Sequence, residues 1–229
     1  FLIQILPAAA PLSCNADAQL LQVPYSVQGL EDWCFLHSLS MLLQHRGHEI
    51  HPREIAQNLH LGPNEGAGSA LSVALLGWLP DSLGNYIQDT FAERYEYVWP
   101  IALTSDENYE RIKEWIAQGT PVLFAANLLG NSGKTLPHAI VIVGYDDCGG
   151  KKCVYIHDPS GAWGSDMDQV TKQPGATHFV AARVPWSEIN NRCFLNVNAY
   201  MLRLTNTVPA AAQEAMLSEG KSLLSTVTK

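Results

Sequence analysis

Apolar positions in the first half of the chain recur at the spacing of α-helices. They predict four helices, over residues 34–46, about 52–60, 68–79 and about 106–118. In the first of these, leucines recur from Leu36 to Leu43 and Gly47 supplies the stop. The last begins at a polar Ser105-Asp106 cap region and ends at Gly119, which suits a helix with defined ends.

The second half of the chain has short runs of β-branched and aromatic residues, with turn residues between them. Five strands are predicted, over residues 121–129, 138–146, 153–158, 178–184 and 198–204. Helices first and antiparallel strands afterwards predict an α+β domain with two lobes, rather than an alternating α/β fold. We place this domain at 21–206, between an N-terminal extension over 1–20 and a C-terminal tail over 207–229.

Composition narrows the class of protein. With 229 residues, 47% of them apolar and 16% charged, the chain suits one packed domain and not a disordered segment. Its net charge of -8 and the lack of a basic stripe argue against nucleic acid as a partner. No apolar run reaches the ~20 residues that a membrane span needs.

The first residues, FLIQILPAAAPLSCNADAQ, resemble the rear part of an export signal. They are apolar, rich in alanine and proline, and end in Ala16-Asp17-Ala18, a small-residue cleavage pattern. This pattern predicts a secreted or periplasmic protein. The alternative is an ordinary extension that packs on the domain, and the protein is then cytoplasmic.

The cysteines are five in number, so an exported chain with paired cysteines keeps one thiol free. Cys148 and Cys153 flank Gly-Gly-Lys-Lys between two apolar runs, which predicts a hairpin with a disulfide across it. Cys34 then carries a free thiol. In a reducing compartment all the cysteines remain thiols.

Cys34 lies where the first helix is predicted to begin. The partial positive charge of a helix N-terminus favours the thiolate, which is the nucleophilic form of cysteine. A buried structural thiol is the competing interpretation. Gln28, six residues earlier, offers an amide that can hold an oxyanion together with the backbone N–H of Cys34.

A base and an orienting acid for such a thiol come from the second half of the chain. His138 lies at the predicted start of an apolar strand, directly after Pro137. Asp158 ends the strand that is expected to pair with it as a hairpin, so both side chains should lie at the same edge of the sheet. A carboxylate there can fix the tautomer of the imidazole. His157 alternates to the opposite face of its strand and is not expected to be the base.

On these residues the chain resembles the papain-like cysteine peptidases. The spacing of Gln28 and Cys34, the strand HAIVIVGY from His138 and the stretch DPSGAWG from Asp158 are similar to that family's motifs. The resemblance covers roughly residues 21–204. The motifs are most similar to the bacterial branch, which includes the C39-like peptidases with an aspartate as third residue, and the secreted staphopains.

The resemblance implies a papain-like two-lobed fold, with the nucleophile at a helix N-terminus in the first lobe and an antiparallel sheet in the second. It implies a triad of Cys34, His138 and Asp158, with Gln28 in the oxyanion hole. The chain departs from cathepsin-type enzymes because it lacks the Cys-Gly-Ser-Cys-Trp signature. Its separation between cysteine and histidine is also shorter than their ~130–150 residues.

Two tryptophans are candidates for substrate binding. The resemblance makes Trp163 the counterpart of a tryptophan that shields the histidine pair, and we expect Trp33, next to the cysteine, to wall the cleft. Neither a cofactor nor a metal is expected. The histidine cluster HRGHEIH is interrupted by the helix-breaking Gly47, and no set of cysteines or carboxylates completes a zinc site.

The leading hypothesis is a cysteine peptidase that hydrolyses a peptide or protein substrate through an acyl-enzyme. The same triad can instead pass the acyl group to an amine, as in a transglutaminase-like transferase. A papain-like module without activity that binds a peptide is a third interpretation. The sequence leaves the oligomeric state of the protein open.

Overall fold

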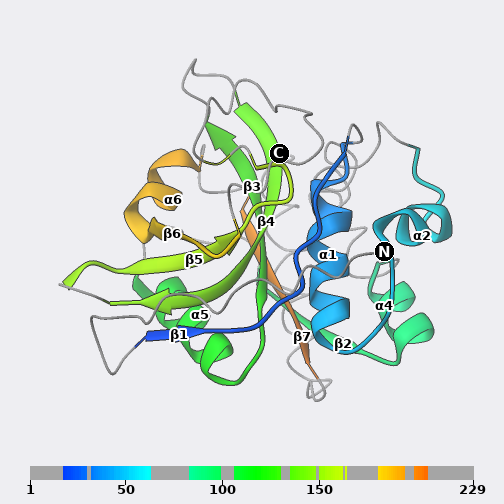
Figure 1. Cartoon of the computed structure of the whole chain (residues 1–229), viewed down its shortest axis with the longest axis horizontal. Coiled ribbons are helices and arrows are strands. Elements are labelled where there is room, and N and C mark those ends of the chain that lie inside the picture. The colour runs from blue at the N-terminus through cyan, green and yellow to red at the C-terminus, as the bar shows by residue number, and fades with distance from the viewer. Residues whose placement is uncertain are drawn as a thin grey trace, which may run out of the picture.

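A computed structural model of the chain describes residues 18–29, 32–62, 83–98, 106–129, 135–147, 150–161, 163, 180–193 and 199–205. The helices in these residues are α1 (Cys34–His45), α2 (Pro52–Asn58), α4 (Gly84–Phe91), α5 (Asp106–Ala117) and α6 (Trp186–Arg192). The strands are β1 (Ala18–Leu20), β2 (Arg94–Val98), β3 (Val122–Leu129), β4 (Thr135–Asp146), β5 (Cys153–His157), β6 (Ala182–Pro185) and β7 (Tyr200–Thr205). Figure 1 shows α1, α2 and α4 grouped to one side of the strands.

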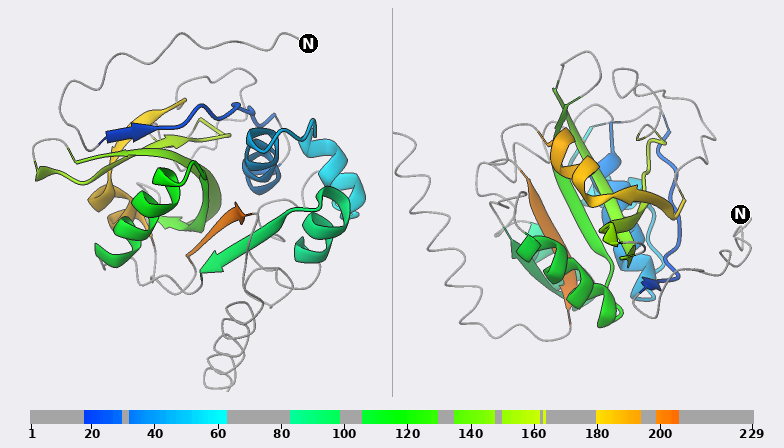
Figure 2. Two further views of the ribbon diagram at one scale, coloured as in Figure 1. Left: turned by 90° about the horizontal axis from the view of Figure 1, so that it is seen from below. Right: turned by 90° about the vertical axis from the view of Figure 1, so that its left-hand side faces the viewer.

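The strands form one antiparallel seven-stranded sheet in the order β2-β7-β3-β4-β5-β6, and β1 pairs with β4. Its central strands are mostly apolar because both faces are covered. Along β3, Leu123 and Ala125 join the core around α1, whereas Val122, Phe124 and Ala126 join the core around α5 and α6. Figure 2 shows α1 and α5 on opposite sides of the sheet. This arrangement confirms the predicted α+β fold.

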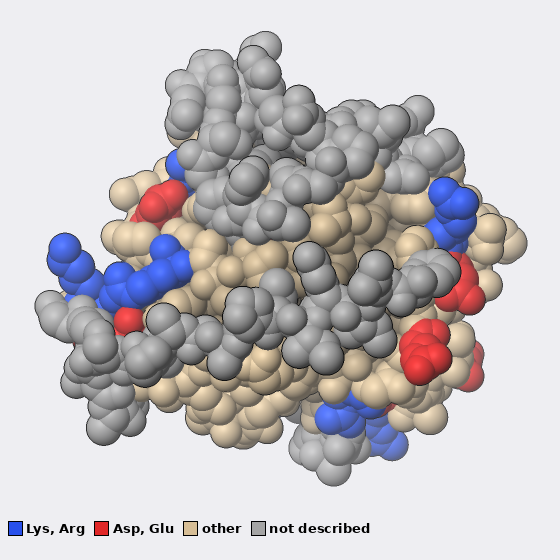
Figure 3. All heavy atoms as spheres, viewed as in Figure 1, with Lys and Arg blue, Asp and Glu red and all other residues tan. Residues whose placement is uncertain are grey.

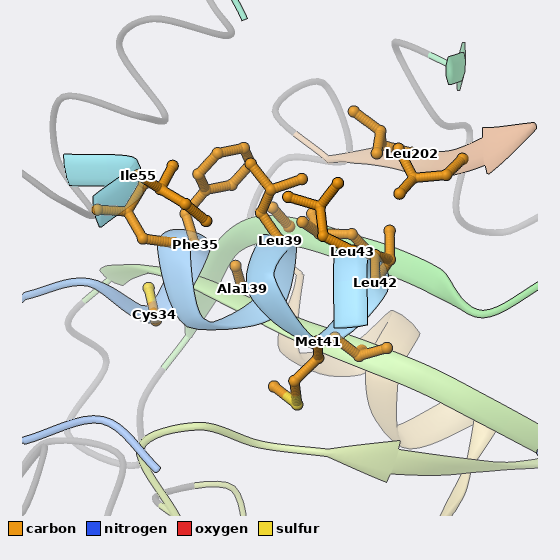
Figure 4. Close-up of a cluster of buried hydrophobic side chains, with 14 of the residues drawn as sticks. Cys34, Phe35, Leu39, Met41, Leu42, Leu43, Ile55, Ala139 and Leu202 are labelled. Carbon is orange, nitrogen blue, oxygen red and sulfur yellow. The ribbon is translucent and has the colours of Figure 1, made fainter. Parts of the chain in front are cut away.

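Helix α1 is the centre of the helical lobe. Each residue from Cys34 to Leu43 is buried, and leucines from several turns pack against Ile55 of α2 and Leu202 of β7 (Figure 4). Full burial of one such leucine contributes about 1.5–3 kcal/mol. The packing therefore fixes the position of the N-terminus of α1 relative to the sheet, and with it the position of Cys34.

Three of the four predicted helices are confirmed as α1, α2 and α5, each within a few residues of its expected bounds. In α2, Pro52 occupies the first helical position, and the His51 side chain and Glu54 form a capping box. The predicted helix over 68–79 lies outside the described residues. The sequence did not predict α4, β2 or α6, which are short and half-exposed on one side.

The predicted start of the histidine strand is wrong by three residues. Strand β4 begins at Thr135 and continues through Pro137, which pairs with Asn127 of β3. Pro137 lacks the backbone N–H that a strand ladder uses. Strand β5 pairs with β4 only from Val141 onward, so the Pro137 end of β4 has a ladder to β3 and can accommodate proline as at a sheet edge.

Strand β1 lies at the end of the predicted N-terminal extension. Residues 18–20 of the predicted extension form β1, which pairs with β4 at Asp146, Tyr145 and Gly144. Gly144 is required there, because a Cβ atom at this position would collide with the backbone carbonyl oxygen of Gln19. The tail over 207–229 lies outside the described residues.

Charged side chains on the face drawn in Figure 3 lie in small separate groups. Ion pairs among the described residues include Arg183 with Asp146 at 2.8 Å and Arg46 with Glu93 at 3.2 Å. Within the described part of the chain, no helix is long and apolar enough to cross a membrane.

Candidate active site

Cys34 is the first residue of α1 and is 4% exposed. Figure 4 shows it at the end of the helix, beside the packed leucines. Among the described residues no side chain caps this helix start, and its first turn contains no acidic residue. The helix N-terminus therefore keeps its partial positive charge, which favours a negative charge on the sulfur and on a group bound beside it.

The β4–β5 hairpin brings His138 and Asp158 together. Val141 of β4 pairs with His157 of β5, so the carboxylate that follows β5 lies beside the N-terminal part of β4. His138 Nε2 lies 2.8 Å from Asp158 Oδ1, and both side chains are buried. Cys34 acts on the same imidazole and helps to raise its pKa. Since Nε2 faces Asp158, the ring nitrogen available to the sulfur is Nδ1.

The Asp158 carboxylate has donors on both oxygens. Oδ1 accepts hydrogen bonds from the backbone N–H and the hydroxyl of Ser160, each at 2.9 Å, and Oδ2 accepts one from the backbone N–H of Trp163 at 2.8 Å. The sequence reasoning missed Ser160. A serine two residues after an aspartate in a turn is a common local hydrogen-bond pattern, and it is the signal that could have found it.

The charges of this pair shift both pKa values. Burial alone would lower the pKa of His138, but the Asp158 charge, its hydrogen bond and the contact with Cys34 together raise it to about 10. For Asp158, burial acts to raise the pKa. The His138 charge and the hydrogen bonds from His138 and Ser160 outweigh burial and lower it. The pair therefore favours an imidazolium next to a carboxylate at neutral pH.

Gln28 lies on an N-terminal strap, which we define as residues 21–29. Its side chain is buried, and its backbone N–H donates to the carbonyl oxygen of Pro159 at 2.8 Å. The Tyr25 hydroxyl donates to the carbonyl oxygen of Asp158 at 2.7 Å, and the Ser26 hydroxyl lies 2.8 Å from His37 Nδ1 of α1. The strap is thus attached to both the turn after β5 and helix α1.

The two tryptophans proposed for the substrate cleft are both buried. Trp33 directly precedes α1, and its indole Nε1 donates to the carbonyl oxygen of Gly62 at 3.0 Å. Trp163 packs in the core on the α6 side, with the Arg192 guanidinium 5.6 Å from the centre of its ring. Trp163 also reaches the predicted site, because its backbone N–H binds Asp158.

The other buried histidines are occupied by structural contacts. His157 Nε2 lies 3.1 Å from the carbonyl oxygen of Val23, and its Nδ1 accepts from the backbone N–H of Ala181, so the ring is held as the neutral Nε2–H tautomer. Burial lowers the pKa of His157 and brings that of His37 to about 4. Among the described residues, no group of three histidine, cysteine or acidic side chains could hold a metal ion.

The predicted Cys148–Cys153 disulfide is not formed in this structure, where Cys153 carries a free buried thiol. The strand register pairs Cys153 with Asp146, so the hairpin does not place Cys153 opposite Cys148. Cys148 lies outside the described residues. Cys193 is also a free buried thiol, and burial raises the pKa of Cys153 and brings that of Cys193 to about 12.

Comparisons with known proteins identify the family of this chain. No curated protein matches the sequence. Among solved structures, the crystal structure of UfSP from C. elegans matches with a TM-score of 0.39 and 14% identity, covering 82% of this chain and 33% of that one. The chain thus spans about a third of that protein's length. The model of the Peptidase_C39 like family matches residues 20–193. The chain belongs to the Peptidase_C39 like family.

Proposed function

We propose that this protein is a cysteine peptidase that hydrolyses peptide bonds with a triad of Cys34, His138 and Asp158. The observation that carries the proposal is the buried His138–Asp158 pair, 2.8 Å apart, together with Cys34, which acts on the same imidazole from an uncapped helix start. Each group then has a distinct part in the reaction, as in other thiol peptidases.

The sulfur of Cys34 attacks the carbonyl carbon of the scissile peptide bond, with its proton held by His138. The imidazolium gives that proton to the leaving amine as the tetrahedral intermediate collapses to a thioester. Water, deprotonated by the now neutral imidazole, hydrolyses the thioester and regenerates the thiol. Asp158 keeps Nε2 of His138 protonated and so leaves Nδ1 to exchange the proton.

Gln28 completes the proposed site as an oxyanion donor. Its side-chain amide and the backbone N–H of Cys34 would hold the negative oxygen of the tetrahedral intermediate. The strap supports this assignment, because the backbone of Gln28 is fixed to Pro159, the residue that follows Asp158. The uncapped start of α1 supplies the second donor.

Covalent labelling with an epoxide probe for thiol peptidases tests the nucleophile. The wild-type protein should incorporate one probe per chain, and Cys34→Ala should incorporate none. Cys153→Ala and Cys193→Ala are matched controls, because each removes another buried free thiol, and both should label as the wild type does. Labelling that persists in Cys34→Ala would show that the nucleophile is elsewhere.

Replacement of Gln28 by alanine is expected to lower kcat by roughly 10²- to 10³-fold, because one oxyanion donor is lost. Initial rates on a peptide cleaved by the wild-type protein measure the loss. Gln22→Ala is the matched control, since it removes an exposed glutamine from the same strap and should leave kcat unchanged. A kcat of Gln28→Ala close to that of wild type would exclude the oxyanion assignment.

The same triad can also catalyse acyl transfer, so an experiment has to identify whether water or an amine accepts the acyl group. Mass spectrometry of the products in the presence of added primary amines separates the two reactions. Incorporation of water alone supports hydrolysis, and amide products at a rate that rises with amine concentration would identify a transferase.

A further inference from the structure

Ser160 contacts both members of the buried ion pair. Its hydroxyl donates to Asp158 Oδ1 at 2.9 Å and lies 3.4 Å from His138 Nε2, while its backbone N–H donates to the same Oδ1 at 2.9 Å. The side chain is buried, at 7% exposure. None of the sequence motifs assigned a role to this residue, and the reaction proposed above uses none of its atoms.

We propose that Ser160 is a positioning residue whose hydroxyl holds the Asp158 carboxylate in the orientation that His138 requires. The proposal rests on the proposed function, because it assumes that His138 exchanges protons with Cys34. It adds a fifth side chain to the proposed site of Cys34, His138, Asp158 and Gln28.

The argument starts from the freedom of a carboxylate to rotate about its last carbon–carbon bond. The Trp163 backbone N–H holds Oδ2, and the two donors of Ser160 hold Oδ1, so rotation is prevented. One Oδ1 lone pair is then directed at His138 Nε2. A carboxylate held in this way also holds the imidazole plane, and with it the Nδ1 that the proposed reaction uses to exchange a proton with Cys34.

Replacement of Ser160 by alanine removes only the side-chain hydroxyl. The backbone N–H still donates to Oδ1 in an alanine variant, so the turn keeps its main-chain hydrogen bond. The hydroxyl alone lies within reach of both Oδ1 and Nε2. Its loss therefore affects the ion pair more than the path of the chain.

Several charged or titratable groups surround the Asp158 carboxylate. His138 faces it from β4 and Cys34 lies beyond the imidazole on α1, while Tyr25 on the strap binds the Asp158 carbonyl oxygen. Arg192 of α6 stacks on Trp163. The hydrogen bonds of Ser160 act in the same direction as the His138 charge, and they lower the pKa of Asp158.

Kinetics of Ser160→Ala and Ser160→Thr test the proposal. In Ser160→Ala we expect kcat to fall roughly tenfold with KM within about twofold, because the ground-state contacts of the substrate are unchanged. Ser160→Thr keeps a hydroxyl and should stay within about threefold of wild-type kcat. Ser40→Ala is the matched control, since it removes another buried serine hydroxyl, bonded to the carbonyl oxygen of His37, and should not change kcat.

A proton NMR signature separates positioning from a structural effect. The Nε2–H resonance of His138 reports the bond to Asp158, and it should shift and broaden in Ser160→Ala but not in Ser40→Ala. An unchanged kcat and resonance in Ser160→Ala would overturn the proposal, as would an equal loss of kcat in Ser160→Thr. The proposed function fails separately, if Cys34→Ala keeps its activity or its probe label.

Discussion

Replacement of His138 by alanine is expected to lower kcat by about 10⁴-fold or more, since both the proton acceptor for Cys34 and the acid for the leaving amine are lost. The imidazole pairs with the Asp158 carboxylate, and Cys34 contributes to its raised pKa. Because KM depends on substrate contacts that this change does not remove, it should change far less than kcat.

The same substitution should also lower the free energy of unfolding at neutral pH, by roughly 3–5 kcal/mol. It leaves the Asp158 carboxylate fully buried without the cation that faces it. The loss should shrink as pH falls below about 4, where the wild-type pair itself loses its stabilising contribution. Thermal denaturation at pH 3 and pH 7.5 measures this difference.

His48→Ala is a suitable control for the His138 prediction. His48 is partly buried and its Nε2 lies 3.0 Å from Glu93 in the helical lobe, away from the proposed site. This variant also loses a histidine–carboxylate pair, yet it should retain wild-type kcat. If His138→Ala retains more than about one-hundredth of wild-type kcat, His138 is not the base.

The sheet and the main helices could be predicted because their patterns are strong and local. Alternate residues of β3 and β4 pack into two different cores. The sequence of each strand is therefore a mostly apolar run bounded by turn residues. The start of α1 follows from its leucine spacing. The short elements α4 and β2 are half-exposed and lack such a pattern, and they owe their structure to packing against α1 and β7.

The proximity of His138 and Asp158 could be predicted because a hairpin fixes which residues lie at the same edge of a sheet. The contact of Cys34 with them could not follow from local pattern alone, since it depends on how α1 packs on β4 and β7. The structural roles of Trp33 and Ser160 were missed for a related reason. Trp33 depends on one hydrogen bond to Gly62, a partner far along the chain, and Ser160 acquires its role only where Asp158 meets His138 of another strand.

Replacement of Asp158 by asparagine is expected to lower kcat by roughly 10²- to 10⁴-fold at neutral pH. Asparagine keeps the size of the side chain but removes the charge that contributes most to raising the pKa of His138 to about 10. The pKa of His138 should therefore fall, and the alkaline limb of the kcat/KM profile should move to lower pH with it. Rates measured from pH 5 to pH 10.5 in both proteins test this shift.

The stability of the wild-type protein should depend on pH in a way that the Asp158→Asn variant does not share. Because the folded-state pKa of His138 is raised, the contribution of His138 to the free energy of unfolding is complete below about pH 6.5 and is lost as pH rises through about 10. Because the folded-state pKa of Asp158 is lowered, the contribution of Asp158 to the free energy of unfolding is present above about pH 4. It is lost as pH falls through the lowered pKa. The pair is therefore most stabilising between about pH 4 and pH 6.5, and the variant should lose both the acidic and the alkaline slope. If the two proteins show the same slopes in thermal denaturation, the buried pair is not the source of the pH dependence.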